Sequence, residues 1–240
     1  MSFKLPLFHQ SWRQLLFLHW CVSSESIQSR LPEGLVVDTW NGSAYLGIIP
    51  FRMMHLRPSF GFPIPAISNF VELNLRTYVR DRYNRPGVWF FSLDTQNVFG
   101  NWIAQRFFHL NYRFAQTGFS SKSDKNYRCL VKLKDPSFEQ QIFEWQESSY
   151  AFMPSKVPDS LECFLTERYR LFSYDQRKRQ LFTGQIAHKP YCLNRPILKA
   201  YSSDLITDNK FEFTSLGEPN SVLASSGTDV RVFGLERVPA

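Results

Sequence analysis

Between Val71 and Val79, polar side chains stand at strict two-residue spacing, and this run constrains the fold more than any other part of the chain. Successive side chains of a β-strand point to opposite faces, so the run predicts a strand with one aliphatic face and one polar face. The polar face carries four functional side chains, Glu72, Asn74, Arg76 and Tyr78. Such a face lies either in solvent or on a pocket wall, and the alternation alone favours solvent.

The composition is that of a folded protein with a sizeable core. Of the 240 residues, 43% are hydrophobic and 23 are Phe, which excludes a disordered chain. All-β barrels and sandwiches often reach this length as single units. We therefore expect one domain over residues 1–240.

The charge pattern argues against a nucleic-acid partner. The net charge is +7, but Lys and Arg are scattered, and their longest run is Arg177–Arg179. No segment approaches the roughly 20 apolar residues of a membrane span, so we expect a cytoplasmic protein with no membrane partner. The cysteines are widely spaced and are expected to be reduced, buried thiols; they are Cys21, Cys129, Cys163 and Cys192.

Two hairpins are expected in the first half of the chain. Asn41-Gly42 separates the β-rich runs Leu35–Trp40 and Ser43–Phe51, and this dipeptide favours a type I′ turn. The alternating run leads through a turn at Arg82–Pro86 into a partner strand at Gly87–Asp94. These hairpins would place the row of Glu72, Asn74, Arg76 and Tyr78, called the polar ladder below, inside a larger sheet.

Helices and loops are expected between these strands. Ser23 or Ser24 can cap a short helix ending near Arg30, and Asn97 can cap a longer one that ends near Leu110. Prolines make His55–Ser68 a loop, placed over a cavity mouth. Further strands are expected at Tyr112–Thr117, Tyr127–Leu133, Thr166–Tyr174, Gln180–Ala187 and Asp229–Val238, whereas Lys134–Pro158 has weak periodicity. The sum is a mainly β protein with a few helices, either a barrel or a strongly curved sheet.

Common catalytic sequence motifs are absent from the chain. It has no glycine-rich phosphate loop, HExxH, GxSxG or dinucleotide fingerprint, so no cofactor is expected. The five histidines are dispersed, and no metal site is expected. No lysine stands beside a second lysine, which a Schiff-base enzyme would use to lower the pKa of its amine.

A few polar residues outside the ladder have two interpretations. His19 is expected to be packed in a strand rather than to be a ligand. Glu167, Arg168 and Tyr169 form either a second cavity wall or an exposed strand pair. His188 is placed either at a cavity rim or in a buried structural position.

Five motifs, in order along the chain, resemble the YqjF-like family of uncharacterised conserved proteins, within the acetoacetate decarboxylase-like superfamily. They are FLHWCV at Phe17–Val22, LPEGLVVDTWNGSAYLGIIPFRM at Leu31–Met53, ELNLRTYVRD at Glu72–Asp81, RPGVWFFSLD at Arg85–Asp94 and FLTERYRLF at Phe164–Phe172. The resemblance covers about Trp12 to Val238. It implies a β-barrel or cone, decorated by helices, around a central cavity.

The resemblance also implies which reaction is missing. Acetoacetate decarboxylases use two adjacent lysines, and the matching stretch LNYRFA at Leu110–Ala115 has Tyr112 and Arg113 instead. A guanidinium stays protonated and forms no imine, and a phenol cannot form one. Glu72 is the counterpart of a cavity glutamate, which makes a pocket-facing ladder the favoured interpretation.

Two main hypotheses of function follow. The first is a binding or enzymatic cavity for a small polar or anionic organic compound, with Glu72 as catalytic acid or base. Its ligand contacts would be Asn74, Arg76, Tyr78, Tyr112 and Arg113. The alternative is a non-catalytic ligand sensor or a protein-interaction scaffold, and RNA binding through the basic surface is a third hypothesis. The sequence leaves open whether the protein is an enzyme, and also whether it forms a homo-oligomer.

Overall fold

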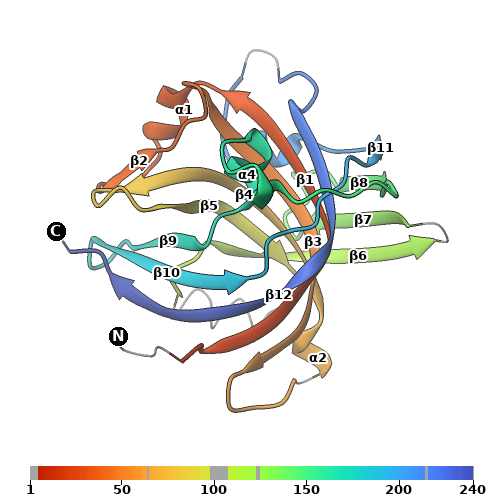
Figure 1. Ribbon diagram of the computed structural model, residues 1–240, viewed down its shortest axis with the longest axis horizontal. Helices are drawn as coiled ribbons and strands as arrows, with labels where there is room; N and C mark the ends of the chain where they lie inside the picture. The colour runs from red at the N-terminus through yellow and green to blue at the C-terminus, as the bar shows by residue number, and fades with distance from the viewer. Residues whose placement is uncertain (1–4, 64, 98–107, 123–124, 214–215, 240) are drawn as a thin grey trace.

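Twelve β-strands in one hydrogen-bonded sheet form the framework of the computed structural model (Figure 1). The structure describes residues 5–63, 65–97, 108–122, 125–213 and 216–239. The strands are β1 (Phe8–Val22), β2 (Leu35–Val37), β3 (Ala44–Pro58), β4 (Phe70–Asp81), β5 (Pro86–Thr95), β6 (Tyr112–Lys122), β7 (Asn126–Leu133), β8 (Gln141–Gln146), β9 (Arg170–Asp175), β10 (Gln180–His188), β11 (Ile197–Ala200) and β12 (Ser221–Arg237). The short helices are α1 (Ser24–Gln28), α2 (Pro65–Ser68), α4 (Leu161–Thr166) and α5 (Asp204–Asp208), with a 3-10 turn at Pro154–Lys156.

The pairing of β4 with β5 closes part of the sheet into a ring. The strands follow the order β5-β9-β10-β12-β1-β3-β4, and β4 pairs again with β5. One edge of β5 serves two partners: Val88 and Trp89 pair with β9, and Leu93–Thr95 pair with β6. The sheet therefore forks at β5, and β6, β7, β8 and β11 leave the ring there. The strongly bent β1 and β12 curve around the ring in Figure 1.

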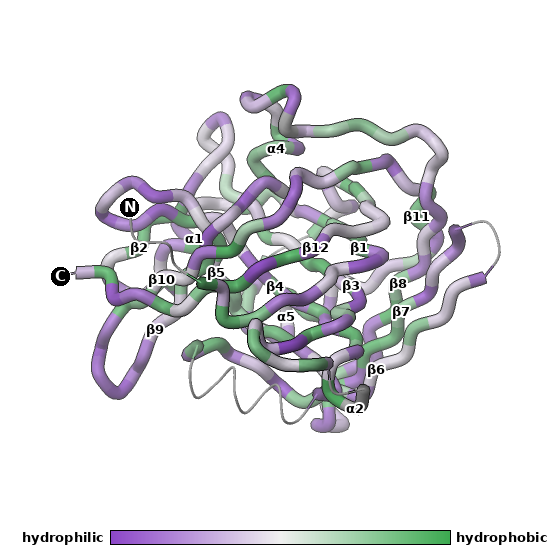
Figure 2. The backbone as a smooth tube through the Cα atoms, turned by 60° about the horizontal axis from the view of Figure 1, so that its bottom comes forward, coloured by the Kyte–Doolittle hydropathy of each residue, from purple (hydrophilic) through white to green (hydrophobic). Residues whose placement is uncertain are grey.

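The main core fills the side of the sheet that carries the aliphatic residues of β4. Leu73 and Leu75 are fully buried there with Leu16 and Leu18 of β1. The same core extends to the outer strands, where Trp145 of β8 is fully buried. Hydrophobic and hydrophilic segments alternate along β6, β7 and β8 in Figure 2, as expected for strands covered on one face.

The expected mainly β class is confirmed, and several local predictions are also confirmed. Ser23 caps α1 by accepting a hydrogen bond from the Ser26 N–H at 3.2 Å. The β4–β5 hairpin turns at Arg82–Arg85, where Asn84 has φ 59°. The predicted helix between Asn97 and Leu110 lies almost entirely outside the described residues.

The first predicted hairpin is only partly correct. Asn41 and Gly42 have φ 49° and 82°, as a type I′ turn requires, but its arms are joined by a single bridge between Trp40 and Ser43. Strand β2 instead pairs with Val79–Asp81 of β4. Strand β3 pairs with the preceding part of the same β4 edge, so β2 and β3 lie end to end rather than side by side.

Other expectations are wrong in extent. The proline-rich region is not all loop, because β3 continues to Pro58 and α2 occupies Pro65–Ser68. The sequence does not predict strand β8, because it lies in Lys134–Pro158, where the periodicity is weak. The last strand begins at Ser221 rather than Asp229. Of the cysteines, Cys129 is buried, whereas Cys21 and Cys192 are exposed, so the expectation of buried thiols holds only in part.

Gly227 of β12 allows close contact between β12 and β1. Its φ is 131°, and a Cβ there would lie 2.0 Å from the Trp12 carbonyl oxygen. We expect Gly227→Ala to lower the free energy of unfolding by about 2–4 kcal/mol, because it adds backbone strain and a clash. Chemical denaturation measures this change. Gly217→Ala is the matched control, since a Cβ at Gly217 meets nothing within 4 Å; equal loss in both variants would contradict the prediction.

Candidate functional site

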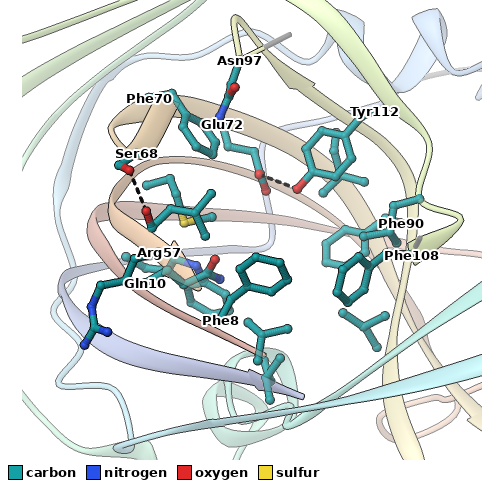
Figure 3. A pocket seen from close by; sticks show the side chains of 18 of the residues that line it. Phe8, Gln10, Arg57, Ser68, Phe70, Glu72, Phe90, Asn97, Phe108 and Tyr112 are labelled. Atoms are coloured by element: carbon teal, nitrogen blue, oxygen red, sulfur yellow. Dashed lines mark hydrogen bonds between the residues drawn. The ribbon is translucent and has the colours of Figure 1, made fainter. Parts of the chain in front are cut away.

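A cavity of about 260 Å³ lies against the polar face of β4, with walls contributed mainly by apolar side chains. Phe8, Phe70, Phe90 and Phe108 surround it in Figure 3, and Glu72 and Tyr112 approach each other across one side. Its lining comes from both sides of the fork at β5, including Val88, Leu93 and Leu171 of β9. The part of the chain predicted as a loop over a cavity mouth also reaches it, through Leu56, Arg57, Pro58, Phe62, Ile67 and Ser68.

Glu72 and Tyr112 form a buried carboxyl–phenol pair on this wall. The Tyr112 hydroxyl donates a hydrogen bond to Glu72 Oε2 at 2.9 Å (Figure 3). Strand β4 supplies Glu72, which is 3% exposed, and the first residue of β6 supplies Tyr112. The pair thus depends on β5, which holds β4 on one edge and β6 on the other.

Burial controls the protonation of this pair. Loss of solvation raises the pKa of Glu72 to about 7, although hydrogen bonds from Tyr112 and Asn74 favour its ionised form. Burial and the adjacent Glu72 raise the pKa of Tyr112 well above its ordinary value. The phenol therefore stays a donor, whereas the carboxyl group can take up or release a proton near neutral pH.

Arg76 lines the same cavity and is oriented by a fixed set of hydrogen bonds. Its Nη2 donates to the Leu165 carbonyl oxygen at 3.1 Å and to Tyr78 Oη at 3.3 Å. Tyr78 Oη itself donates to the Leu165 carbonyl at 2.6 Å. His19 Nε2, 2.7 Å from Tyr78 Oη, must then be the donor in that contact. Burial lowers the pKa of His19 well below its ordinary value, so this histidine is a neutral, packed residue, as expected.

The structure separates the six predicted site residues into three groups, one of which is Arg113 alone. Glu72, Arg76 and Tyr112 line the cavity. Asn74 and Tyr78 lie behind them and orient Glu72 and Arg76 through hydrogen bonds. These five residues form one connected region of the cavity wall.

Arg113 differs from the other predicted site residues because it does not line the cavity, and its hydrogen bonds to Asp94 and Ser92 go to residues that do not line it either. It forms a two-pronged ion pair with Asp94, at 2.6 and 2.7 Å, and donates to Ser92 Oγ at 3.2 Å. Neighbouring residues of a strand point to opposite faces, so Tyr112 and Arg113 cannot share one pocket. The ion pair instead fastens the start of β6 to β5 and so helps to place Tyr112.

Three further residues line the cavity although the sequence does not predict them as ligand contacts. Arg168 belongs to the segment for which the sequence allows either a second cavity wall or an exposed strand pair. It lines the cavity and pairs with Asp38 at 2.7 Å. Trp12 and Tyr191 also line it. Trp12 belongs to β1, and Tyr191 follows the end of β10, in a segment without periodicity. Only a long-range arrangement of strands could have identified them.

Other classes of site have less support in the part of the chain described. No group of three or more His, Cys, Asp or Glu side chains there could hold a metal ion. A search of the described helices finds none long and apolar enough to cross a membrane.

Solved structures define the class of fold. The acetoacetate decarboxylase from Legionella pneumophila aligns over 100% of this chain and 90% of its own, with a TM-score of 0.68 and 12% identity. The enduracididine biosynthesis enzyme MppR complexed with pyruvate aligns over 98% of this chain and 91% of its own, with a TM-score of 0.66 and 11% identity. The protein therefore has the acetoacetate decarboxylase-like fold; at these identities the likeness shows the fold alone.

Sequence comparison then defines the family. The model of domain of unknown function 2071, described as an uncharacterized conserved protein, matches residues 9–229. The uncharacterized protein YqjF of Bacillus subtilis (strain 168) is 36% identical over 194 residues, which are 78% of this chain and 75% of the relative. The chain belongs to this family, as its motifs indicated.

The raised pKa of Glu72 makes stability depend on pH in a defined direction. Glu72 titrates near 4.5 when unfolded and near 7 when folded, so between these values the folded state binds more protons. The contribution of Glu72 to stability therefore falls as pH rises from 4.5 through 7, by about 3 kcal/mol in total. We expect Glu72→Gln to remove this fall, measured by denaturation at several pH values.

The control is Glu144→Gln, which alters a carboxylate in a surface ion pair with Arg128. It should preserve the pH dependence of the wild type. An unchanged pH dependence in Glu72→Gln would contradict the titration assigned to the cavity.

Proposed function

We propose that this protein binds a small, mostly apolar organic compound with a polar or anionic group, and that Glu72 exchanges a proton with it. The observation that carries this proposal is the Glu72–Tyr112 pair, which faces a cavity of about 260 Å³ with mainly apolar walls. A buried carboxyl group without an ion-pair partner is costly in a purely structural role. A cavity with apolar walls and a few polar groups is typical of small-molecule sites.

The chemistry supported by the pair is general acid–base catalysis. With a pKa of about 7, Glu72 is present both as acid and as base near neutral pH, which is the condition for efficient proton transfer. Tyr112 can hold a developing oxyanion or return the carboxyl group to its working orientation. Carbonyl compounds with an acidic α-proton are the class on which such a pair acts.

An imine mechanism is not part of this proposal. No lysine is found among the described residues that line the cavity. Tyr112, at the position that matches the decarboxylase lysine pair by resemblance, is occupied by its hydrogen bond to Glu72. The protein, if an enzyme, is therefore proposed to use proton transfer rather than Schiff-base decarboxylation.

The non-catalytic alternative also has a specific observation in its favour. Phe60 and Phe62 are each 90% exposed on the segment between β3 and α2, and Phe62 also lines the cavity. A sensor would couple the cavity to a partner through such a segment. Mass spectrometry of the purified native protein separates the candidates, because a retained small molecule favours a ligand site and an empty cavity favours the scaffold.

Proton exchange tests the catalytic proposal without a known product. We expect the protein to exchange α-protons of some members of a panel of β-keto acids, lactones and enol esters with D2O, followed by NMR. Glu72→Gln should slow this exchange by about 100-fold or more, since it removes the acid–base group. Glu144→Gln is again the surface control, and exchange that persists in Glu72→Gln would remove Glu72 from the mechanism.

A further inference from the structure

We propose that the end of the cavity formed by Arg76 and Tyr191 holds the carboxylate of an organic acid whose apolar body extends toward Glu72 and Tyr112. This inference rests on the proposed function, because it specifies the ligand of the same cavity. It adds Tyr191 as a residue that determines specificity and assigns an orientation to the ligand.

The first observation is that Arg76 has no carboxylate partner among the described residues. Other enclosed arginines do: Arg168 pairs with Asp38, and Arg113 pairs with Asp94. The hydrogen bonds of Arg76 go only to neutral oxygens, those of Leu165 and Tyr78. A guanidinium in an apolar cavity without a counter-ion is unfavourable, and a bound anion would supply the missing charge.

The second observation is that Arg76 and Tyr191, which both line the cavity and both pack near Phe17, carry unused donors. Arg76 Nη2 is occupied, whereas its Nη1 and the Tyr191 hydroxyl make no hydrogen bond within the described part of the chain. Arg76 Nε is also enclosed without a hydrogen-bond partner. Both groups pack on the Phe17 ring, with Arg76 Cζ 5.7 Å and the Tyr191 ring 5.5 Å from its centre.

The surrounding charges favour an anion over a neutral group. Arg76 and Arg168 both approach the Tyr78 ring, at 5.6 and 5.1 Å from its centre. Two carboxylates lie near this end: Asp38 is shared by Arg168 and Arg80, and Glu167 accepts a hydrogen bond from the Tyr191 backbone N–H at 2.9 Å. Three guanidinium groups thus face two carboxylates, which leaves one positive charge uncompensated at the Arg76 end.

The protonation state of Tyr191 makes its hydroxyl a second hydrogen-bond donor, in addition to Arg76. Burial raises the pKa of the Tyr191 hydroxyl, so it remains a donor at neutral pH. Its O–H and the Arg76 Nη1–H can meet one carboxylate, whose oxygens only accept hydrogen bonds. The mainly apolar lining of the rest of the cavity favours a monocarboxylate with an aryl or alkyl body.

A matched pair of probes tests this assignment in the intact protein. The cavity is first filled with the neutral apolar dye N-phenylnaphthylamine, and displacement by hydrocinnamate and by its neutral carboxamide is then compared. We expect the carboxylate to bind at least tenfold more tightly than the amide. Arg76→Gln should weaken carboxylate binding by about 10- to 100-fold and leave amide binding within about threefold.

Two further variants separate the roles of the residues. Tyr191→Phe keeps the ring and should weaken carboxylate binding by about three- to tenfold, with little effect on the amide. Arg128→Gln is the control, because Arg128 lies half-exposed on β7 in an ion pair with Glu144 and is not among the residues that line the cavity. It should bind both probes as the wild type does.

The outcomes distinguish this inference from the proposed function. Dye binding with equal displacement by both probes, with displacement by neither, or with equal loss for both in Arg76→Gln overturns the carboxylate site and leaves the cavity intact. Failure of the wild-type protein to bind the dye contradicts the ligand cavity itself, and both proposals then fail. Dye binding by Arg76→Gln also shows that the variant is folded.

Discussion

The hydrogen bonding of β5 to three other strands is the constraint on which the rest of the structure depends. Its pairing with β4 closes the ring, and its other edge is divided between β9 and β6. The closure places both faces of β4 inside the protein, one against the aliphatic core and one against the cavity. The division of the β5 edge brings Tyr112 opposite Glu72. Without either pairing, the polar ladder would be an ordinary solvated strand face.

Desolvation in this closed sheet changes the proton affinity and the charge balance of the polar side chains on β4. Glu72 is enclosed and forms no ion pair with another described residue, and its proton affinity rises. At the other end of the ladder, Arg76 is enclosed without an anion, and its charge is left uncompensated among the described residues. Asn74 and Tyr78 stabilise these two groups by hydrogen bonds rather than by neutralising them. The two uncompensated groups make the cavity electrically asymmetric.

Local alternation predicted much of this arrangement, but not its closure. The period of two in Val71–Val79 predicts β4 and its division into faces, because that period is a property of the strand alone. The same period separates Tyr112 from Arg113, a consequence that the resemblance to lysine-pair enzymes obscured. Tyr191 could not be predicted, since it follows a strand end and reaches the cavity only through long-range packing. The burial of the polar face likewise depends on β9 and β12, which lie far away in the sequence.

The regular pairing of β4 with β3 fixes the distance between side chains along β4. Its register is unbroken from Phe70 to Thr77, so the four-residue step between Glu72 and Arg76 corresponds to roughly 13 Å along the strand. Changes in the segments around Phe60 and Phe62 would reshape the walls without altering this separation. Relatives built on the same strand could therefore accept ligands of different width, while the distance between the ligand carboxylate and the carbon that exchanges a proton stays constant.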